Sequence, residues 1–189
     1  FPIAFSKHDS SKLYTFSNQV HLSTDEGQSW ETISPDLTRN DKSKLVSSGG
    51  PITQDNTGVE YYATIFAVDE SPIQEGLMWV GSDDGMIHLT KDSGKTWENV
   101  TPKKIPEWLM INSIDASSFD TGTAYIAGTR YKLGDFKPYL YVTEDYGKNW
   151  KLITSGIDDE HFTRVLGADK SNKNILYAGT ETGMYISYD

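Results

Sequence analysis

The chain has 189 residues and a formal net charge of −10, from 27 acidic and 17 basic residues. This acidic balance argues against a nucleic-acid ligand, because binding to a phosphate backbone needs clustered lysine and arginine. The chain contains no cysteine, which excludes disulfides and thiolate metal sites. No apolar run reaches the roughly 18 residues that a membrane-spanning helix needs, so no membrane insertion is expected.

Short runs of alternating apolar and polar residues follow one another along the chain, and many of them end in turn-forming residues. This period of two, rich in valine, isoleucine, leucine and tyrosine, is typical of β-strands with one buried face. The runs fall into four groups, of which the first three contain four runs and the last contains three. In chain order they are 3–9, 12–17, 19–25 and 29–34, then 64–72, 76–85, 85–92 and 96–102, then 111–120, 123–131, 139–145 and 149–154, and last 165–172, 175–183 and 183–189.

An eight-residue motif joins the third run to the fourth in each of the first three groups. It reads STDEGQSW at 23–30, TKDSGKTW at 90–97 and TEDYGKNW at 143–150, and SYD at 187–189 repeats its beginning. A repeat of this length with four strands per unit is typical of a β-propeller, in which each unit forms one blade. The sequence therefore predicts an all-β fold, a partial β-propeller of four-stranded antiparallel blades with three full blades and an incomplete fourth.

The same pattern sets the expected domain organisation, a single partial propeller domain over 1–189. We expect blade 1 at about 1–36, an inserted loop at 37–60, blade 2 at about 61–102, blade 3 at about 109–155 and the incomplete blade 4 at about 162–189. Because the chain starts without methionine and stops inside a motif, we expect a fragment of a longer chain. Open blades leave unpaired strand edges, so the expected partners include the remaining blades of the parent chain or self-association through these edges.

Each motif position has a structural explanation. The aspartate can accept hydrogen bonds from backbone amides two residues further on, as in Asx turns, and the glycine supplies the positive φ angle that a tight turn needs. The tryptophan opens the outer strand and can bury its large ring against the neighbouring sheet. The motif residues with this expected structural role are Asp25, Gly27, Trp30, Asp92, Gly94, Trp97, Asp145, Gly147 and Trp150.

The motif resembles the Asp box, or BNR repeat, of sialidase-like propellers. The stretches GSDDGMIHLTKDSGKTWENVTP and YAGTETGMYISYD, with SSGGPITQDNTGVEYY, resemble more specifically bacterial propellers related to sortilin and to xyloglucanases. The resemblance covers essentially the whole chain, and it implies a propeller segment of a secreted or periplasmic glycosyl hydrolase-type protein that acts on or binds polysaccharide. In such relatives the Asp box lies away from the usual ligand face, which implies that the motif aspartates are not catalytic.

The ligand face of such a propeller is built by the connections between second and third strands and between successive blades. Long loops on one rim of a rigid scaffold are where binding sites are usually placed, and the insertions at 35–60 and 131–138 fall there. Two carboxylates about 5–5.5 Å or 6.5–9.5 Å apart can hydrolyse a glycosidic bond. The candidate substrate-binding residues are Glu60, Asp83, Asp84, Arg130, Tyr131, Asp135, Arg164 and Glu181. Several of them also fit ordinary solvated turns, since DDG and TETG are common turn sequences.

Three functions remain open from the sequence. The chain fits a glycosyl hydrolase-type protein for polysaccharide, a non-enzymatic sortilin-like propeller that binds a peptide or protein, or a scaffold. Sequence spacing does not decide among them, because the residues of a carboxylate pair would come from different blades. No metal or cofactor is expected, since His21 and His88 share their strand position with Tyr141 and Tyr185, which indicates a packing position.

Overall fold

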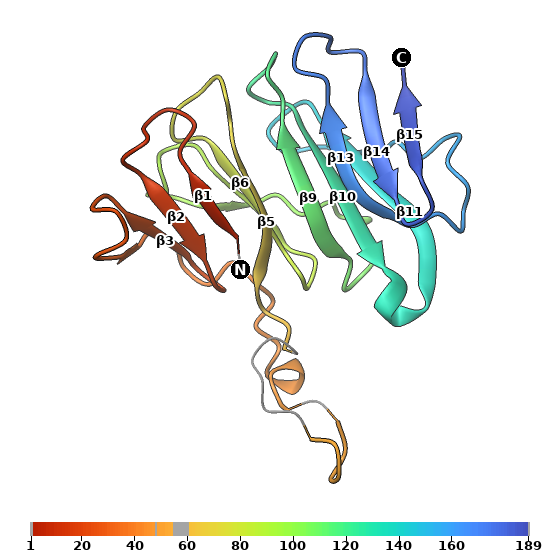
Figure 1. Ribbon diagram of the computed structural model, residues 1–189, viewed down its shortest axis with the longest axis horizontal. Coiled ribbons are helices and arrows are strands. Elements are labelled where there is room, and N and C mark those ends of the chain that lie inside the picture. The colour runs from red at the N-terminus through yellow and green to blue at the C-terminus, as the bar shows by residue number, and fades with distance from the viewer. Residues whose placement is uncertain (1, 48, 55–60, 189) are drawn as a thin grey trace.

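The computed structural model describes residues 2–47, 49–54 and 61–188, in which nearly all regular structure is β (Figure 1). Within these residues the helical elements are two 3₁₀ turns, η1 (Lys42–Lys44) and η3 (Tyr131–Leu133). The strands form four antiparallel sheets that follow the order of the chain. Sheet 1 contains β1 (Ile3–Phe5), β2 (Leu13–Phe16), β3 (Val20–Ser23) and β4 (Glu31–Thr32), and sheet 2 contains β5 (Ile65–Glu70), β6 (Met78–Ser82), β7 (Ile87–Thr90) and β8 (Glu98–Asn99). Sheet 3 contains β9 (Met110–Ala116), β10 (Ala124–Arg130), β11 (Asp135–Thr143) and β12 (Lys151–Leu152), and sheet 4 contains β13 (Thr163–Ala168), β14 (Leu176–Thr180) and β15 (Met184–Ser187).

The four sheets lie side by side like an open fan, with sheet 1 and sheet 4 at its two ends (Figure 1). This arrangement confirms the predicted all-β fold, a partial propeller with three four-stranded units followed by a three-stranded one. The outer strands β4, β8 and β12 are shorter than predicted, because only two residues of each pair with the third strand of their sheet.

Apolar side chains fill the junctions between neighbouring sheets, and their burial favours the stacking. One cluster lies between sheets 1 and 2, a second and larger one between sheets 2 and 3, and a third between sheets 3 and 4. Representative members, in that order, are Phe16 with Val80, Trp79 with Ile126, and Leu140 with Leu166.

The close approach of sheets 2 and 3 requires a glycine in β6. A Cβ atom built on Gly81 would lie only 2.5 Å from Cγ2 of Ile111 in β9. The pairing of β5 with β6 shifts its register next to this glycine, between Ile65 and Ala67. The backbone of β6 is therefore packed directly against a side chain of the next sheet.

The eight-residue motif forms the turn between the third and fourth strands in sheets 1 to 3. In the first copy the Asp25 carboxylate accepts hydrogen bonds from the backbone amide (2.8 Å) and the hydroxyl (2.6 Å) of Ser29. The second and third copies repeat this, with Thr96 bound to Asp92 and Asn149 bound to Asp145. The amide therefore lies four residues after the aspartate, and the expectation of an amide two residues further on was wrong.

A hydroxyl two residues before the aspartate takes the amide that was expected to bind the carboxylate. Ser23 Oγ accepts a hydrogen bond from the amide of Gly27 (2.8 Å), and Thr90 and Thr143 do the same in the other two copies (2.9 Å each). The motif glycines have φ angles of 83°, 88° and 79°, which confirms their predicted left-handed conformation. The hydroxyl thus accepts the N–H group of the glycine, and the carboxylate accepts the N–H group two residues after that glycine.

Two of the three motif tryptophans link their sheet to the one before it. The indole Nε1 of Trp97 donates to the backbone carbonyl of Ile33 (3.0 Å), and that of Trp150 donates to the carbonyl of Val100 (2.8 Å). Trp30 belongs to the first sheet and is 42% exposed. Its indole lies at the end of the fan, where no preceding sheet covers it in the described structure.

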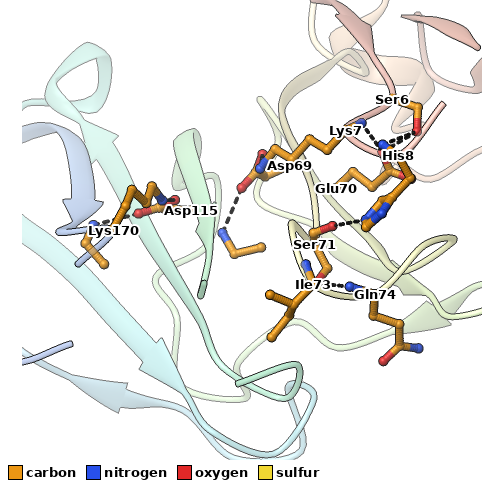
Figure 2. Close-up of polar contacts among 12 residues, drawn as sticks. Ser6, Lys7, His8, Asp69, Glu70, Ser71, Ile73, Gln74, Asp115 and Lys170 are labelled. Atoms are coloured by element: carbon orange, nitrogen blue, oxygen red, sulfur yellow. Dashed lines mark hydrogen bonds and ion pairs between the residues drawn. The ribbon is translucent and has the colours of Figure 1, made fainter. Parts of the chain in front are cut away.

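Buried and partly buried carboxylates form a second link between neighbouring sheets (Figure 2). Asp69 at the end of β5 accepts the backbone N–H of Ala116 (2.8 Å) and pairs with Lys7 Nζ (2.6 Å), so it joins sheet 2 to both neighbours. Asp115 makes the corresponding contacts one sheet later. Its carboxylate accepts the backbone N–H of Ala168 (2.6 Å) and pairs with Lys170 Nζ (2.6 Å). Between sheets 1 and 2, Glu70 also accepts the Ser6 hydroxyl and the Lys7 amide, both at 2.7 Å. Every junction therefore combines apolar packing with carboxylate hydrogen bonds.

Candidate functional site

The fan has two rims of different construction. The motif rim carries the motif turns and the turns between first and second strands. The loop rim carries the turns between second and third strands and the connections from one sheet to the next, among them the segments with η1 and η3 (Figure 1). The described candidates all lie on the loop rim, and they are Asp83, Asp84, Arg130, Tyr131, Asp135, Arg164 and Glu181. Glu60 lies outside the described residues.

Asp84 is buried and ties the inserted loop to sheet 2. Its carboxylate accepts the Ser82 hydroxyl and the backbone N–H of Arg39 (2.9 Å), and Arg39 Nε donates to its backbone carbonyl (2.7 Å). With its oxygens occupied in this way, Asp84 holds Arg39 in place, although 45 residues separate the two in the sequence. This geometry suits an anchor better than a group that exchanges protons with a ligand.

Asp83 lies beside Asp84 in the same turn but is only partly buried. Its Oδ1 atom accepts the backbone N–H of Thr64 (2.9 Å). Burial raises the pKa of Asp83 to about 6, and the neighbouring charge of Asp84 adds to this effect. Burial and the charges of both carboxylates also raise the pKa of Tyr62. Asp83 is therefore the rim carboxylate best suited to carry a proton near neutral pH.

Tyr62 and Trp108 form the first aromatic group of the loop rim. Their ring centroids lie 5.0 Å apart at an interplanar angle of 56°. The Arg39 guanidinium lies 5.3 Å and the Lys44 ammonium 5.9 Å from the centroid of the Trp108 ring, within cation–π range. Trp108 has a φ angle of 61°, a conformation that bulky residues rarely adopt. Residues from two connections, β4–β5 and β8–β9, thus meet at one ring pair.

Tyr131, Phe136 and Phe162 form the second aromatic group, between sheets 3 and 4. Tyr131 stacks on Phe162 with centroids 5.2 Å apart, and Phe136 lies 5.9 Å from the same ring. The Arg164 guanidinium lies 4.6 Å from the Tyr131 centroid and 4.8 Å from the Phe162 centroid, while its Nε donates to Glu181 (2.9 Å). Phe136 is 49% exposed, so the group presents an aromatic face to solvent.

Arg130 and Asp135 pair with each other beside the second aromatic group. Arg130 Nη1 lies 2.8 Å from Asp135 Oδ2, which also accepts the Tyr139 hydroxyl (2.7 Å). Burial and this contact raise the pKa of Tyr139 to about 12. Burial alone would raise the pKa of Asp135, but the hydrogen bonds from Tyr139, Lys137 and Arg130 outweigh it and lower that pKa. Asp135 is thus an ionised, paired carboxylate that fixes the turn.

Arg39, Lys44 and Phe162 contribute to the rim although they were not among the residues predicted from the sequence. Arg39 and Lys44 lie in the inserted loop, and only the fold brings them to Trp108. Phe162 directly precedes β13 and stacks below the predicted Tyr131. Its place at the head of an inner strand, next to Arg164, was a signal that could have identified it.

Two further observations concern metals and membranes. Among the described residues, no three His, Cys, Asp or Glu side chains are grouped as a metal site would require. Over the same residues, no helix has the length and apolar character needed to cross a bilayer.

Comparisons with known proteins agree with the repeat architecture. The model of the Sortilin-Vps10 family, described as sortilin, neurotensin receptor 3, matches residues 18–188. The chain belongs to the Sortilin-Vps10 family. This membership confirms the resemblance to sortilin-like propellers that the motif predicted. No curated protein matches the chain.

Solved structures with a similar fold include glycoside hydrolases and a propeller of another kind. An ancestral GH74 enzyme is 19% identical, with 99% of this chain matched to 22% of that one at a TM-score of 0.69. The GH74 xyloglucanase from Xanthomonas campestris is 16% identical, with 99% and 28% covered and a TM-score of 0.69. YCF48 from Cyanidioschyzon merolae is 20% identical, with 66% and 36% covered and a TM-score of 0.51. At these identities the likeness concerns the fold, and this Sortilin-Vps10 chain spans about a quarter of the length of the GH74 chains.

Proposed function

We propose that the loop rim binds a polysaccharide or another glycan. The observation that carries this proposal is the pair of aromatic groups on one rim, Tyr62 with Trp108 and Tyr131 with Phe136 and Phe162. Aromatic and apolar side chains combined with a few placed polar groups are the usual lining of small-molecule sites. Arg39 and Arg164 supply such groups beside the rings. A structure of the same fold is a xyloglucanase by its own description, which supports a glycan as the ligand.

The carboxylates of the rim differ in what they can contribute. Glycoside hydrolysis needs an acid that holds a proton and a second carboxylate at a defined separation. The pKa of about 6 at Asp83 fits the acid, whereas Asp84, Asp135 and Glu181 are held by hydrogen bonds or ion pairs within the protein. We therefore propose glycan binding for these 189 residues, with Asp83 as the acid of a hydrolase-type site that is completed by further carboxylates.

The proposed setting follows the expectations from the sequence. The 189 residues act as one propeller unit with an inserted loop at 37–60, as part of a longer chain or in association with other sheets through the open edges. A secreted or periplasmic location suits a protein that meets polysaccharide outside the cytoplasm. Fractionation of source cells with an antibody against the chain tests this location, and a signal confined to the cytoplasm would contradict it.

Calorimetric titration with β-glucan and xyloglucan oligosaccharides tests the glycan proposal. We expect Phe136→Ala and Trp108→Ala to weaken binding at least tenfold, because each removes a ring from one of the two groups. The matched control is Phe119→Ala, which removes an exposed aromatic ring from the motif rim. Absence of binding at millimolar sugar, or an equal loss in the Phe119 variant, would refute the proposal.

A peptide ligand is the second candidate. The exposed Phe136 and the Arg164–Glu181 pair both adjoin Phe162, and this mixture of apolar and charged groups also suits a peptide side chain and its terminus. The family description names a neurotensin receptor, which supports this candidate. A peptide library screened on the immobilised chain, with the same Phe136 and Phe119 variants, distinguishes the two: capture of peptides and not of glycans would favour the second.

A further inference from the structure

The three arginines of the chain all lie on the loop rim, but they differ in their partners. Arg130 pairs with Asp135, and Arg164 pairs with Glu181. Arg39 forms no ion pair with any carboxylate of the described residues. Within the same residues its two terminal nitrogens, Nη1 and Nη2, have no hydrogen-bond partner, since its bonds run through the backbone N–H and Nε.

Arg39 is nevertheless held in one position. Its backbone N–H donates to the Asp84 carboxylate (2.9 Å), its Nε donates to the Asp84 carbonyl (2.7 Å), and its guanidinium carbon lies 5.3 Å from the centroid of the Trp108 ring. A guanidinium presents its nitrogens in a rigid plane that matches the two oxygens of a carboxylate or another oxyanion. Because the fold already fixes this side chain, little further conformational entropy is lost when an anion binds to it.

Two lysines add positive charge at the same place. The Lys44 ammonium lies 5.9 Å from the centroid of the same Trp108 ring. Lys132, in η3, is exposed, and its charge opposes the rise of the Asp83 pKa, so it lies within electrostatic reach of the turn between β6 and β7. Neither lysine forms an ion pair with a carboxylate of the described residues. Two separate segments, the inserted loop and η3, thus bring cations to one turn.

The two aspartates of that turn do not cancel this charge at the surface. Asp84 is 1% exposed, and its carboxylate accepts the Ser82 hydroxyl and the Arg39 amide. Asp83 is partly buried, and burial raises its pKa to about 6. Like charges close together repel each other, so an anion placed between Arg39 and Lys44 is attracted by both. A local excess of positive charge therefore exists in a chain whose net charge is −10.

We propose that the glycan bound at the loop rim is acidic, a polysaccharide with carboxylate or sulfate groups on its sugars. The Nη atoms of Arg39 bind one such group, and Lys44 and Lys132 attract this group or its neighbours along the polymer. The sugar rings lie against the aromatic groups of the rim. A neutral glycan makes only the ring contacts and binds more weakly. This inference rests on the proposed function, glycan binding by the loop rim, and names the class of glycan.

Two matched pairs of ligands test the charge requirement by titration calorimetry. The first pair is an oligogalacturonate and its fully methyl-esterified form, and the second is a sulfated galactan oligosaccharide and its desulfated form. We expect the charged member of at least one pair to bind at least tenfold more tightly than the neutral member, and which pair responds distinguishes carboxylate from sulfate. The difference should shrink as sodium chloride is added, because salt screens exposed charges. Equal affinity within both pairs would overturn the proposal.

Protein variants locate the anion. Arg39→Gln is expected to weaken binding of the charged ligand at least tenfold and to leave binding of the neutral one unchanged. Because Arg39 also anchors the inserted loop, Lys44→Gln and Lys132→Gln provide a second measurement at side chains without a hydrogen bond in the described structure, and each should weaken only the charged ligand. The matched control is Lys95→Gln, which removes an exposed lysine from the motif rim. An equal loss in the Lys95 variant would show that only the overall charge matters and would overturn the proposal.

The same titrations separate this inference from the proposed function. If neutral glycans bind and charged ones bind no more tightly, the acidic class is wrong and glycan binding stands. If neither member of any pair binds at millimolar concentration, both proposals fall. A poly-glutamate peptide serves as a further probe, and binding of this peptide without binding of any acidic glycan would assign the cations to a peptide ligand and overturn the inference.

Discussion

Replacement of His88 by phenylalanine is expected to remove a pH dependence of folding stability. His88 lies in β7 and is only 9% exposed, and its Nδ1 atom has no hydrogen-bond partner. Burial lowers its pKa from 6.5 to about 4, against a small opposing effect of the Asp36 charge. The imidazole is therefore neutral in the folded protein at pH values where it would be charged in the unfolded chain.

The lowered pKa of His88 sets the sign and the size of the change in folding stability with pH. Between pH 6.5 and about 4 the unfolded state binds a proton that the folded state does not, so the free energy of unfolding falls as the pH falls. At about 1.4 kcal/mol per unit, the full effect is about 3 kcal/mol. Roughly 2 kcal/mol of it is lost between pH 7.5 and 5.0, and the stability is fully present above pH 6.5.

Urea unfolding at pH 7.5, 6.5 and 5.0 measures the effect as a difference between wild type and His88→Phe. We expect the variant to gain about 2 kcal/mol relative to wild type on going from pH 7.5 to 5.0. The control is His21→Phe, at the equivalent position of β3, where the ring is hydrogen-bonded to Ser17 and Thr32. Parallel pH profiles for wild type and the His88 variant would refute the reasoning that burial keeps this imidazole neutral.

Three further predictions concern the junctions between sheets. Gly81→Ala should lower the free energy of unfolding by about 1–3 kcal/mol, because the added Cβ atom would meet Ile111. In the comparison variant Gly134→Ala, on the exposed η3 turn, the added Cβ atom meets no atom within 4 Å, so this variant measures the cost of a positive φ angle alone. Asp69→Ala should cost about 1–3 kcal/mol, since the Ala116 amide loses its acceptor, and a cost no larger than that of Lys7→Ala would contradict this. Trp150→Phe should cost about 1 kcal/mol or more in thermal unfolding, through the lost hydrogen bond to Val100, and an unchanged Tm would argue against that bond.

Much of the architecture could be predicted because it is local and repeated. The motif places a turn glycine and a tryptophan at fixed distances from two strands, and three copies reinforce one another. The lengths of the outer strands were harder to predict. After Trp30, Trp97 and Trp150 only two residues pair with the third strand before the chain leaves the sheet. The amide partner of the motif aspartate was also mispredicted, because the preceding hydroxyl competes for the nearer amide.

The chemical roles of the carboxylates in the candidate site could not be predicted from the sequence. Topology alone places Asp83, Asp84 and Asp135 on one rim, but their chemical differences depend on burial and on partners distant in the sequence. Asp84 is bound by Arg39, and only the fold brings this residue of the inserted loop to the turn between β6 and β7. No periodicity or turn pattern encodes such a contact. Only the three-dimensional structure therefore distinguishes the carboxylates that are held by the protein from those that are free to contact a ligand.

The features that the three junctions share affect how the molecule is expected to respond to mechanical force and to duplication of a blade. Contacts run from each sheet to the next one in the chain, so the cooperativity of folding is of the nearest-neighbour kind. Mechanical pulling at the two termini is expected to peel off a terminal sheet before the middle ones, in discrete steps. Because each junction combines a carboxylate with a row of apolar residues, duplication of one unit would supply a compatible surface for the next. We therefore expect the gain or loss of a single blade to disturb only the junctions next to it.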